Sequence, residues 1–376
     1  MINYISNLPK DLRSGGFSAM NVAAFSVLSS LETVHYVGPI NPPLALWHKA
    51  LSKSLRLMGS QGDFSFFSDR RLEAIADEVG VQCATSARLD FFHGFTPWAL
   101  TRTHRPYVAW SDCTFRDYID IFHRREKYRE CDLKRIEQTE AAWLRNARRV
   151  LFTSDWAATR AMSCYALNAG RVGNVGIFGE IDLPSRDAYA GEKEFAFVST
   201  NFEAKGGQIV LAAFREVRER HPDARLTVVG DQPSHCIVDP GVHFVGFLRK
   251  EVSHEYERFK HILGRARALV HPTKCDIAPL LIVEAGYAGC PVIASRRFAI
   301  PELVSDGVTG LLLDDTSKVS AVSSAMNWML DNGDQYGHMR EAAWINTRAR
   351  HSKERFQDRL LSHLREAFVG EVMPVQ

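Results

Sequence analysis

The chain has 376 residues, of which 45% are hydrophobic and 24% are charged, as in an ordinary globular protein. This length predicts two domains, each large enough to bury a core of its own. The formal net charge of +2 is too small to indicate nucleic acid as a partner, because such binding normally requires a clustered basic face. No apolar run approaches the roughly 20 residues of a membrane-spanning helix.

The seven cysteines are odd in number and scattered, and no pair has the short spacing of a zinc or redox motif. We therefore expect reduced thiols and a cytoplasmic protein. The amino terminus has no basic segment followed by an apolar one, so we expect no signal peptide.

Short apolar runs alternate with longer segments of helical period through the first half of the chain. The expected strands are residues 2–5, 34–37, 89–92, 107–110 and 150–153. The expected helices between them include residues 17–31, 70–79 and 134–147. Strands that alternate with helices predict βαβ units and a parallel sheet.

A polar stretch at 178–193 contains Gly and Pro, lacks a clear period and is the expected linker. The alternation then starts again. The expected strands are residues 195–199, 226–229, 242–245, 268–271 and 291–295. The expected helices are residues 207–220, 252–266 and 280–288, and further helices over 318–368.

One sheet would not comfortably hold all these strands. We therefore predict an α/β fold of two Rossmann-like, doubly wound parallel-sheet domains, residues 1–178 and 194–350, that face a central cleft. A terminal helix within 351–376 would pack back toward the first domain. Ligands of such sheets bind beyond the carboxyl ends of the strands, so the cleft is the expected ligand site.

Several well-known motifs are absent from the sequence. It has neither G-x-G-x-x-G nor G-x-x-x-x-G-K-[ST], so the dinucleotide fingerprint and the P-loop are missing. It has no Asp-x-Asp that would suggest a metal-held diphosphate, and no G-x-S-x-G nucleophile elbow.

The most specific stretch is 271–313, where a carboxylate is set into the apolar face of an expected helix. The helical neighbours of Glu284 are all apolar: Leu280, Leu281, Tyr287 and Ala288. Because an unpaired buried carboxylate is costly, Glu284 needs donors, which a ribose diol or a buried Arg or Lys could supply. Asp276 lies in the loop that enters the same helix, and the free N–H groups at the helix start suit a phosphate.

Lys205 lies in the loop after the strand 195–199, just before Gly206 and Gly207 open a helix. A Lys at a helix amino terminus opposes the helix dipole unless an anion lies between the two. The glycines would let the backbone approach that anion closely. The alternative is a solvated surface lysine.

The first domain offers two further candidates. Gly15 and Gly16 follow the first strand, where they make room for a ligand or simply form a tight turn. His93 falls at the carboxyl end of the strand 89–92, where functional groups of parallel sheets gather. A structural histidine is the alternative.

Taken together, these segments resemble glycosyltransferase family 4, which has the GT-B fold, over most of the chain and most strongly over 195–313. Asp276 and Glu284 match a family motif in which seven residues separate an acidic residue from a following Glu. Its A-G-x-x-G-x-P-V-I-A-S pattern is present at 285–295, and P-E-L-V-x-D-G-x-T-G-L-L at 301–312. Lys205-Gly206, Gly15-Gly16 and His93 match further family positions, as do the segments 228–230 and 149–158.

The resemblance implies a retaining transferase that needs neither metal nor cofactor. The donor would be a UDP-, GDP- or ADP-sugar and the acceptor a saccharide or a lipid-linked molecule. Lys205 would hold the diphosphate, Asp276 the transferred sugar and Glu284 the ribose, while backbone near Gly16, Leu280 and Leu281 would face the phosphates. His93 would lie by the reacting carbon or the acceptor.

The sequence also departs from the family pattern. Thr200 replaces a common Arg among the donor-binding positions, and Asp276 is shorter than the usual Glu. Pro279 replaces a Gly and has no N–H to offer. Near the linker, the segment 178–182 replaces the n-G-V-D sequence that is usual in the family. Arg249 and Arg296 are candidates to supply the charge missing at Thr200.

Residues 43–59 form a candidate amphipathic helix in which Lys49, Lys53 and Arg56 lie apart from the apolar side chains. Such a helix would give peripheral contact with the inner face of a membrane, or it packs on the sheet with a solvated basic face. Two other functions compete with sugar transfer. A non-catalytic homologue could bind a nucleotide sugar or a partner enzyme, and a GT-B isomerase could act on a nucleotide sugar.

Overall fold

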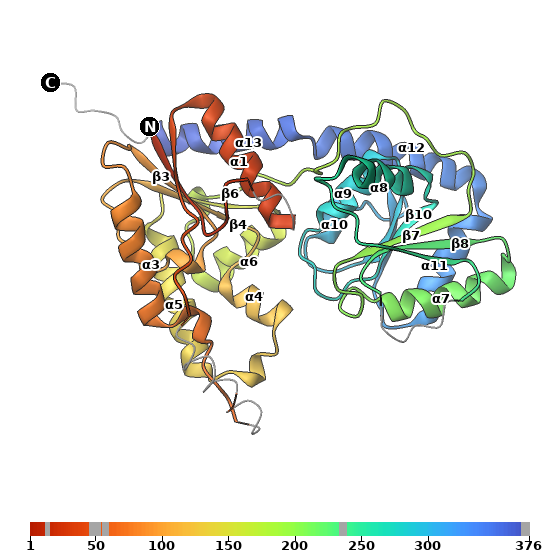
Figure 1. Ribbon diagram of the computed structural model, residues 1–376, viewed down its shortest axis with the longest axis horizontal. Coiled ribbons are helices and arrows are strands. Elements are labelled where there is room, and N and C mark those ends of the chain that lie inside the picture. Colours follow the sequence, from red (N-terminus) through yellow and green to blue (C-terminus); the bar gives the residue numbers. More distant parts are fainter. Residues whose placement is uncertain (12–15, 45–53, 55–59, 233–238, 370–376) are drawn as a thin grey trace. The chain divides into compact units, whose positions relative to one another are not determined.

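The computed structural model describes residues 1–11, 16–44, 54, 60–232 and 239–369. The chain divides into two compact units, each built on its own sheet of six parallel strands (Figure 1). The first unit comprises Met1–Gly176 together with Gln357–Gln376, and the second comprises Ile177–Phe356. The prediction of two doubly wound α/β domains is therefore confirmed.

The strands of the first unit lie in the order β2-β1-β3-β4-β5-β6. They are β1 Ile2–Ile5, β2 Val34–Val37, β3 Leu89–His93, β4 Tyr107–Ser111, β5 Arg149–Phe152 and β6 Val172–Asn174. Every residue of β1, β3 and β4 is buried. Strands buried on both faces are typical of a parallel sheet that helices cover on each side.

Helices cover this sheet. They are α1 Gly16–Leu31, α3 Asp69–Gln82, α4 Phe115–Phe122, α5 Glu130–Asn146, α6 Asp155–Tyr165 and α13 Lys353–Val369. Two of them, α4 and α6, begin at a capping side chain. The hydroxyl of Thr114 accepts a hydrogen bond from the N–H of Asp117, and that of Ser154 accepts one from Ala157. Each bond satisfies a donor that the helix itself leaves open.

The carboxyl-terminal helix α13 packs directly on β6. A Cβ at Gly173 would lie 2.4 Å from the ring of His363, so only glycine fits under the helix. Nε of Arg148 donates to the carbonyl oxygen of Ala367 at 3.3 Å. The chain therefore begins α13 in the second unit and ends it in the first.

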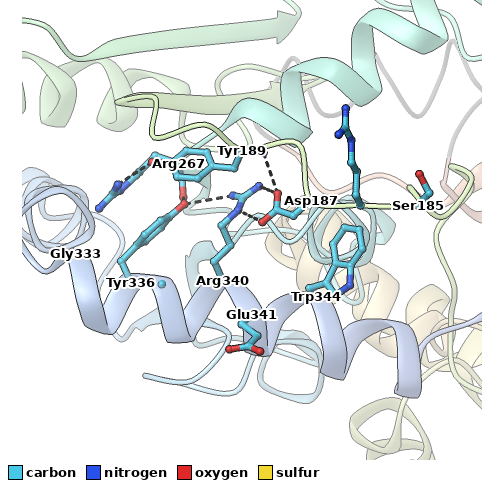
Figure 2. Close-up of a pocket in the computed structure, with 11 residues that line it drawn as sticks. Ser185, Asp187, Tyr189, Arg267, Gly333, Tyr336, Arg340, Glu341 and Trp344 are labelled. Carbon is cyan, nitrogen blue, oxygen red and sulfur yellow. Dashed lines mark hydrogen bonds and ion pairs between the residues drawn. The ribbon is translucent and has the colours of Figure 1, made fainter.

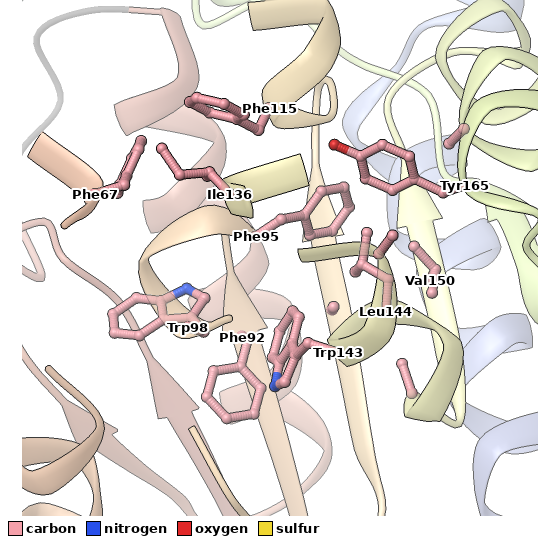
Figure 3. Packing of buried hydrophobic residues seen from close by; sticks show 14 of the residues in the cluster. Phe67, Phe92, Phe95, Trp98, Phe115, Ile136, Trp143, Leu144, Val150 and Tyr165 are labelled. Atoms are coloured by element: carbon pink, nitrogen blue, oxygen red, sulfur yellow. The ribbon is translucent and has the colours of Figure 1, made fainter. Parts of the chain in front are cut away.

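Aromatic side chains dominate the core of the first unit (Figure 3). The ring of Phe92 lies 5.9 Å from that of Trp98 and 5.2 Å from that of Trp143, centroid to centroid. Nε1 of the fully buried Trp98 donates to the carbonyl oxygen of His93 at 3.0 Å. Aromatic pairs at these separations add to the free energy of burial, and here they fix the turn that follows β3.

A carboxyl group, Glu140, is completely buried in this unit. It accepts hydrogen bonds from the hydroxyl of Thr96 at 2.5 Å, from the N–H of Phe115 at 2.7 Å and from the hydroxyl of Tyr165 at 3.0 Å. Burial raises the pKa of Glu140 to about 7, although these hydrogen bonds act to lower it. One side chain of α5 thus joins the turn after β3 to α4 and α6.

We expect the substitution Glu140→Gln to remove a pH dependence of stability. The folded-state pKa of about 7 exceeds the ordinary 4.5, so the unfolded chain releases this proton first as pH rises. The stabilisation by the protonated group is therefore complete below about pH 4.5 and is lost as pH rises through about 7. Between these limits the free energy of unfolding of the wild type should fall by about 3 kcal/mol relative to the variant.

Urea denaturation of both proteins at half-unit pH intervals measures this difference. A difference between the wild type and the variant that stays constant from pH 4.5 to pH 7.5 would contradict the assignment.

The strands of the second unit lie in the order β12-β11-β10-β7-β8-β9. They are β7 Glu194–Ser199, β8 Arg225–Gly230, β9 Val242–Gly246, β10 Ala268–His271, β11 Val292–Ser295 and β12 Gly310–Leu313. The helices are α7 Gly207–Arg220, α8 Ser253–Arg265, α9 Leu280–Tyr287, α10 Ile300–Leu303, α11 Val319–Asp331 and α12 Gly333–Arg350. Buried apolar residues on α7, α11 and the central strands form its core.

The residues expected to link the two domains belong to the second unit. The N–H of Gly179 donates to the hydroxyl of Tyr287 at 3.1 Å, and that of Asp182 donates to the hydroxyl of Tyr256 at 2.8 Å. Further along, Asp187 forms an ion pair with Arg340 at 2.6 Å. The boundary between the compact units therefore falls at Gly176–Ile177, before the polar stretch.

The sequence pattern missed the two short edge strands, β6 and β12. β6 has the sequence VGN and carries no apolar run. β12 has the sequence GLLL, an apolar run too short to tell a strand from other structure. The helices expected over 318–368 are three, because the chain turns at Asn332 and again at His351.

The amphipathic segment 43–59 lies almost entirely outside the described residues. In the described part of the chain, no helix has the length and apolarity required to cross a bilayer.

Candidate functional site

The carboxyl ends of β7 and β10 carry most of the predicted site residues of the second unit. These two strands are parallel neighbours in the sheet, so the loops that follow them emerge at the same edge. Thr200 follows β7 directly and is exposed, and Lys205 lies five residues beyond it. The loop after β10 carries Asp276 and leads into α9.

Two glycines bring the loop after β7 against the loop after β10. Gly206 has φ +85°, and a Cβ there would lie 3.1 Å from the carbonyl oxygen of Pro272. A Cβ on Gly207 would lie 2.5 Å from the ring of Phe202. The left-handed backbone at Gly206 favours glycine, and the close approach there places Lys205 beside the second loop.

Lys205 and Asp276 form an ion pair at this edge. Nζ of Lys205 lies 2.5 Å from Oδ2 of Asp276 and donates to the carbonyl oxygen of Cys275 at 3.4 Å. Both side chains are mostly buried, with 19% and 24% of their surface exposed. Two residues that the sequence predicts to act on one ligand are thus in direct contact.

His271, the last residue of β10, completes this cluster and was not among the predicted site residues. Its Nε2 lies 3.1 Å from Oδ2 of Asp276, and its side chain is almost completely buried. Burial by itself would raise the pKa of Asp276, but the hydrogen bond from His271 and the charge of Lys205 outweigh it and lower that pKa. The position of His271 at a strand end, which singled out His93, was the available signal.

Glu284 lies in the second turn of α9 with only 2% of its surface exposed. Its Oε1 accepts a hydrogen bond from Nζ of Lys250 at 2.5 Å and one from the N–H of Glu180 at 3.0 Å. The alternative of a buried lysine partner, which the sequence left open, is therefore what the free protein contains. Lys250 was missed because it is distant in sequence, in the segment between β9 and α8.

The amino terminus of α9 also lies at this edge of the sheet. Pro279 is the residue that precedes the helix and has no N–H, while the N–H groups of Leu280 and Leu281 have no intrahelical partner. Leu280 is buried and Leu281 is half-buried. The helix start therefore offers backbone donors from two of the predicted positions.

Neither arginine expected to replace the charge missing at Thr200 is free in the described structure. Arg249 is paired with Glu255, and Arg296 is paired with Asp306 and Asp314. Lys250, next to Arg249 in sequence, is the cation that reaches a predicted site residue.

In the first unit, His93 is the last residue of β3 and is 2% exposed. Its Nδ1 lies 3.4 Å from Oγ of Ser6, which follows β1. Gly94, with φ +89°, turns the chain away directly after the histidine. Gly16 begins α1, and Gly15 lies outside the described residues.

A cavity of about 660 Å³ lies elsewhere, between residues 185–189, Arg267 and α12 (Figure 2). Its polar side chains mainly bind one another. Arg340 pairs with Asp187 and also donates to the carbonyl oxygens of Gly264, Ala266 and Ala288. Arg267 precedes β10, so this cavity is at the amino end of that strand and His271 is at the other. These contacts anchor residues 185–189 to α12 within the second unit.

In the part of the chain that the structure describes, no group of three or more His, Cys, Asp or Glu side chains could hold a metal ion. The described cysteines are free thiols: Cys83, Cys113, Cys131, Cys164, Cys275 and Cys290.

Residues 180–344 match the family model described as Glycosyl transferases group 1. Glu284, Asp276, Lys205 and Lys250 all lie within the matched residues. The GDP-mannose-dependent alpha-(1-6)-phosphatidylinositol monomannoside mannosyltransferase of Mycolicibacterium smegmatis is 31% identical over 157 residues, 39% of each chain. The alignments span about two fifths of the length of the curated relatives.

Solved structures resemble the whole chain. HepE from Anabaena, in complex with UDP and glucose, has a TM-score of 0.64 and 16% identity, and the match covers 97% of this chain and 99% of HepE. Sucrose-phosphate synthase from Thermosynechococcus elongatus has a TM-score of 0.66 and 16% identity, with 98% and 99% covered. These similarities confirm the predicted GT-B fold. The narrower assignment to family 4 stays a prediction.

We expect Arg340→Met to destabilise the second unit by about 3 kcal/mol, because it removes a buried cation and leaves three carbonyl oxygens without their donor. Asp187→Asn is the matched control. It keeps those carbonyl bonds and leaves an amide oxygen for Arg340, so it should cost only about 1 kcal/mol.

Equilibrium urea denaturation gives both free energies of unfolding. Equal losses in the two variants would show that the carbonyl contacts of Arg340 contribute nothing to stability.

Proposed function

We propose that this chain is a retaining glycosyltransferase that moves a sugar from a nucleotide diphosphate sugar to a saccharide or lipid-linked acceptor, without a metal ion. The observation that carries the proposal is the contact of Lys205 with Asp276 inside the group 1 domain, at the carboxyl ends of β7 and β10. Ligands of open α/β sheets bind at this edge.

The donor would replace contacts that the free protein makes internally. Lys205 would turn from Asp276 to the diphosphate, while Asp276 would accept hydrogen bonds from sugar hydroxyls. The free N–H groups of Leu280 and Leu281 would face phosphate oxygens at the helix start. Glu284 would bind the ribose. Thr200 has no charge and would contribute at most a hydroxyl to this side of the donor.

The reaction separates charge, and these groups favour its products. The acceptor hydroxyl oxygen bonds to the anomeric carbon, the nucleoside diphosphate leaves with the electrons of the broken bond, and the hydroxyl proton is released. Negative charge builds up on the diphosphate, where Lys205 and the amino end of α9 would stabilise it by fixed charge and dipoles. Since this stabilisation needs no metal, activity should survive chelation.

Two features support this donor class. The curated relative from Mycolicibacterium smegmatis is named as GDP-mannose-dependent, and HepE was solved with UDP and glucose. UDP-, GDP- and ADP-sugars are the candidates for this chain. His93 would lie by the reacting carbon or the acceptor, and Gly15 and Gly16 by the phosphates. We place the protein in the cytoplasm, with residues 43–59 as its contact to a membrane surface.

The first experiment is a thermal-shift panel of UDP, GDP, ADP and their sugars against the wild type and Glu284→Ala. A ligand that binds the folded state raises the melting temperature by mass action. We expect one base to give a shift and the variant to lose most of it. Asp276→Asn should keep the shift with the nucleoside diphosphate and weaken the additional shift given by its sugar.

Donor turnover with an added saccharide or lipid extract, in EDTA, then tests the transfer. Product with the anomeric configuration of the donor supports retention, and inversion would overturn it. Loss of activity in EDTA that Mg²⁺ restores would overturn metal independence. Nucleotide binding without any turnover would indicate the non-catalytic homologue, which the substitutions at Thr200 and Pro279 suggest.

A further inference from the structure

Lys250 forms a cluster with two carboxyl groups of the second unit. Its Nζ lies 2.5 Å from Oε1 of Glu284 and 2.8 Å from Oε2 of Glu180. Burial by itself would lower the pKa of Lys250, but the two carboxylates outweigh it and raise that pKa, so the ammonium stays charged. Burial raises the pKa of Glu180 despite the contact with Lys250.

The cluster is incompletely satisfied. An ammonium has three N–H groups, and Lys250 directs two of them to Glu180 and Glu284. Among the described residues, the third N–H has no hydrogen-bond acceptor, and Nζ lies 5.3 Å from the ring centroid of Phe259. Oε2 of Glu284 has no donor among these residues. Glu284 is 2% exposed, whereas 27% of the Lys250 side chain is exposed, so the cluster opens to solvent on the lysine side.

An open donor and an open acceptor side by side match one kind of chemical group well. Each hydroxyl of a vicinal diol both donates and accepts, so one hydroxyl can donate to the carboxylate while its neighbour accepts from the ammonium. Hydrogen bonds to charged groups are also stronger than those between neutral groups. A diol at this position would satisfy both open groups, whereas a phosphate would be repelled by Glu284.

We infer that Lys250 is a donor-binding residue, which forms with Glu284 a two-residue site for the 2′- and 3′-hydroxyls of the donor ribose. The inference rests on the proposed function and assigns Lys250 a role in it. Glu180 holds the pair in place, with its carboxylate on Lys250 and its N–H on Glu284. The site therefore distinguishes ribose from deoxyribose.

The neighbouring residue provides a matched control. Arg249 is also a cation in the segment between β9 and α8, but its guanidinium is bound to Glu255 and is largely exposed. Arg249→Met therefore changes the net charge by the same amount as Lys250→Met and leaves the Lys250–Glu284 pair intact. General electrostatic attraction for a nucleotide would be weakened similarly in both variants.

The test is isothermal titration calorimetry of the full chain, which measures the dissociation constant of each ligand. The ligands are the nucleoside diphosphate that raises the melting temperature of the protein and the 2′-deoxy and 3′-deoxy forms of that nucleotide. The wild type should bind the ribose form about 10-fold or more tightly than either deoxy form, since a hydrogen bond to a charged group is lost. Lys250→Met should lower this ratio to near 1 for at least one deoxy form. Lys250→Arg should restore part of it, and Arg249→Met should leave it unchanged.

A ratio in Lys250→Met equal to that of the wild type would overturn the inference, as would an equal weakening of all three ligands. Should Lys250→Met fail to fold, the double variant Lys250→Met/Glu180→Gln removes the excess negative charge and must give the same loss of discrimination. A wild type that binds no nucleoside diphosphate would instead overturn the proposed function, and the inference with it.

Discussion

The burial of one carboxylate, Glu284, is the constraint on which the candidate site depends. A buried ionised group must be paired and hydrogen-bonded, because leaving it unpaired costs several kcal/mol. Lys250 supplies the charge and the N–H of Glu180 supplies a further bond. The segment that begins the second unit is thereby drawn onto α9. The pairing of one buried carboxylate thus joins three segments of the second unit.

A carboxylate is also paired with a lysine at the ends of β7 and β10. Lys205 and Asp276 form an ion pair, and Nε2 of His271 contacts the same carboxylate. In the proposed function each partner would turn to a different part of the donor. The same two residues would then stabilise the loops in the absence of the donor and bind it when it is present.

The polar cluster in the cavity beside α12 differs from the one around Glu284. There Arg340 has an acceptor for nearly every donor and holds residues 185–189 in place. At Glu284 an acceptor and a donor remain open among the described residues. The two clusters therefore differ in how completely their polar groups are hydrogen-bonded.

The sequence by itself determined the alternation of strands and helices, the two parallel-sheet domains, and the residues Lys205, Asp276 and Glu284 as candidates. Apolar runs and helical periods are local properties, and the motif residues follow strand ends that such runs define. Only the tertiary structure decided the partners. Lys250 and Glu180 meet Glu284 across 34 and 104 positions of the chain, through sheet order and loop packing that no local pattern encodes. The short edge strands β6 and β12 likewise exist because neighbouring strands offer them hydrogen bonds, which only the assembled sheet provides.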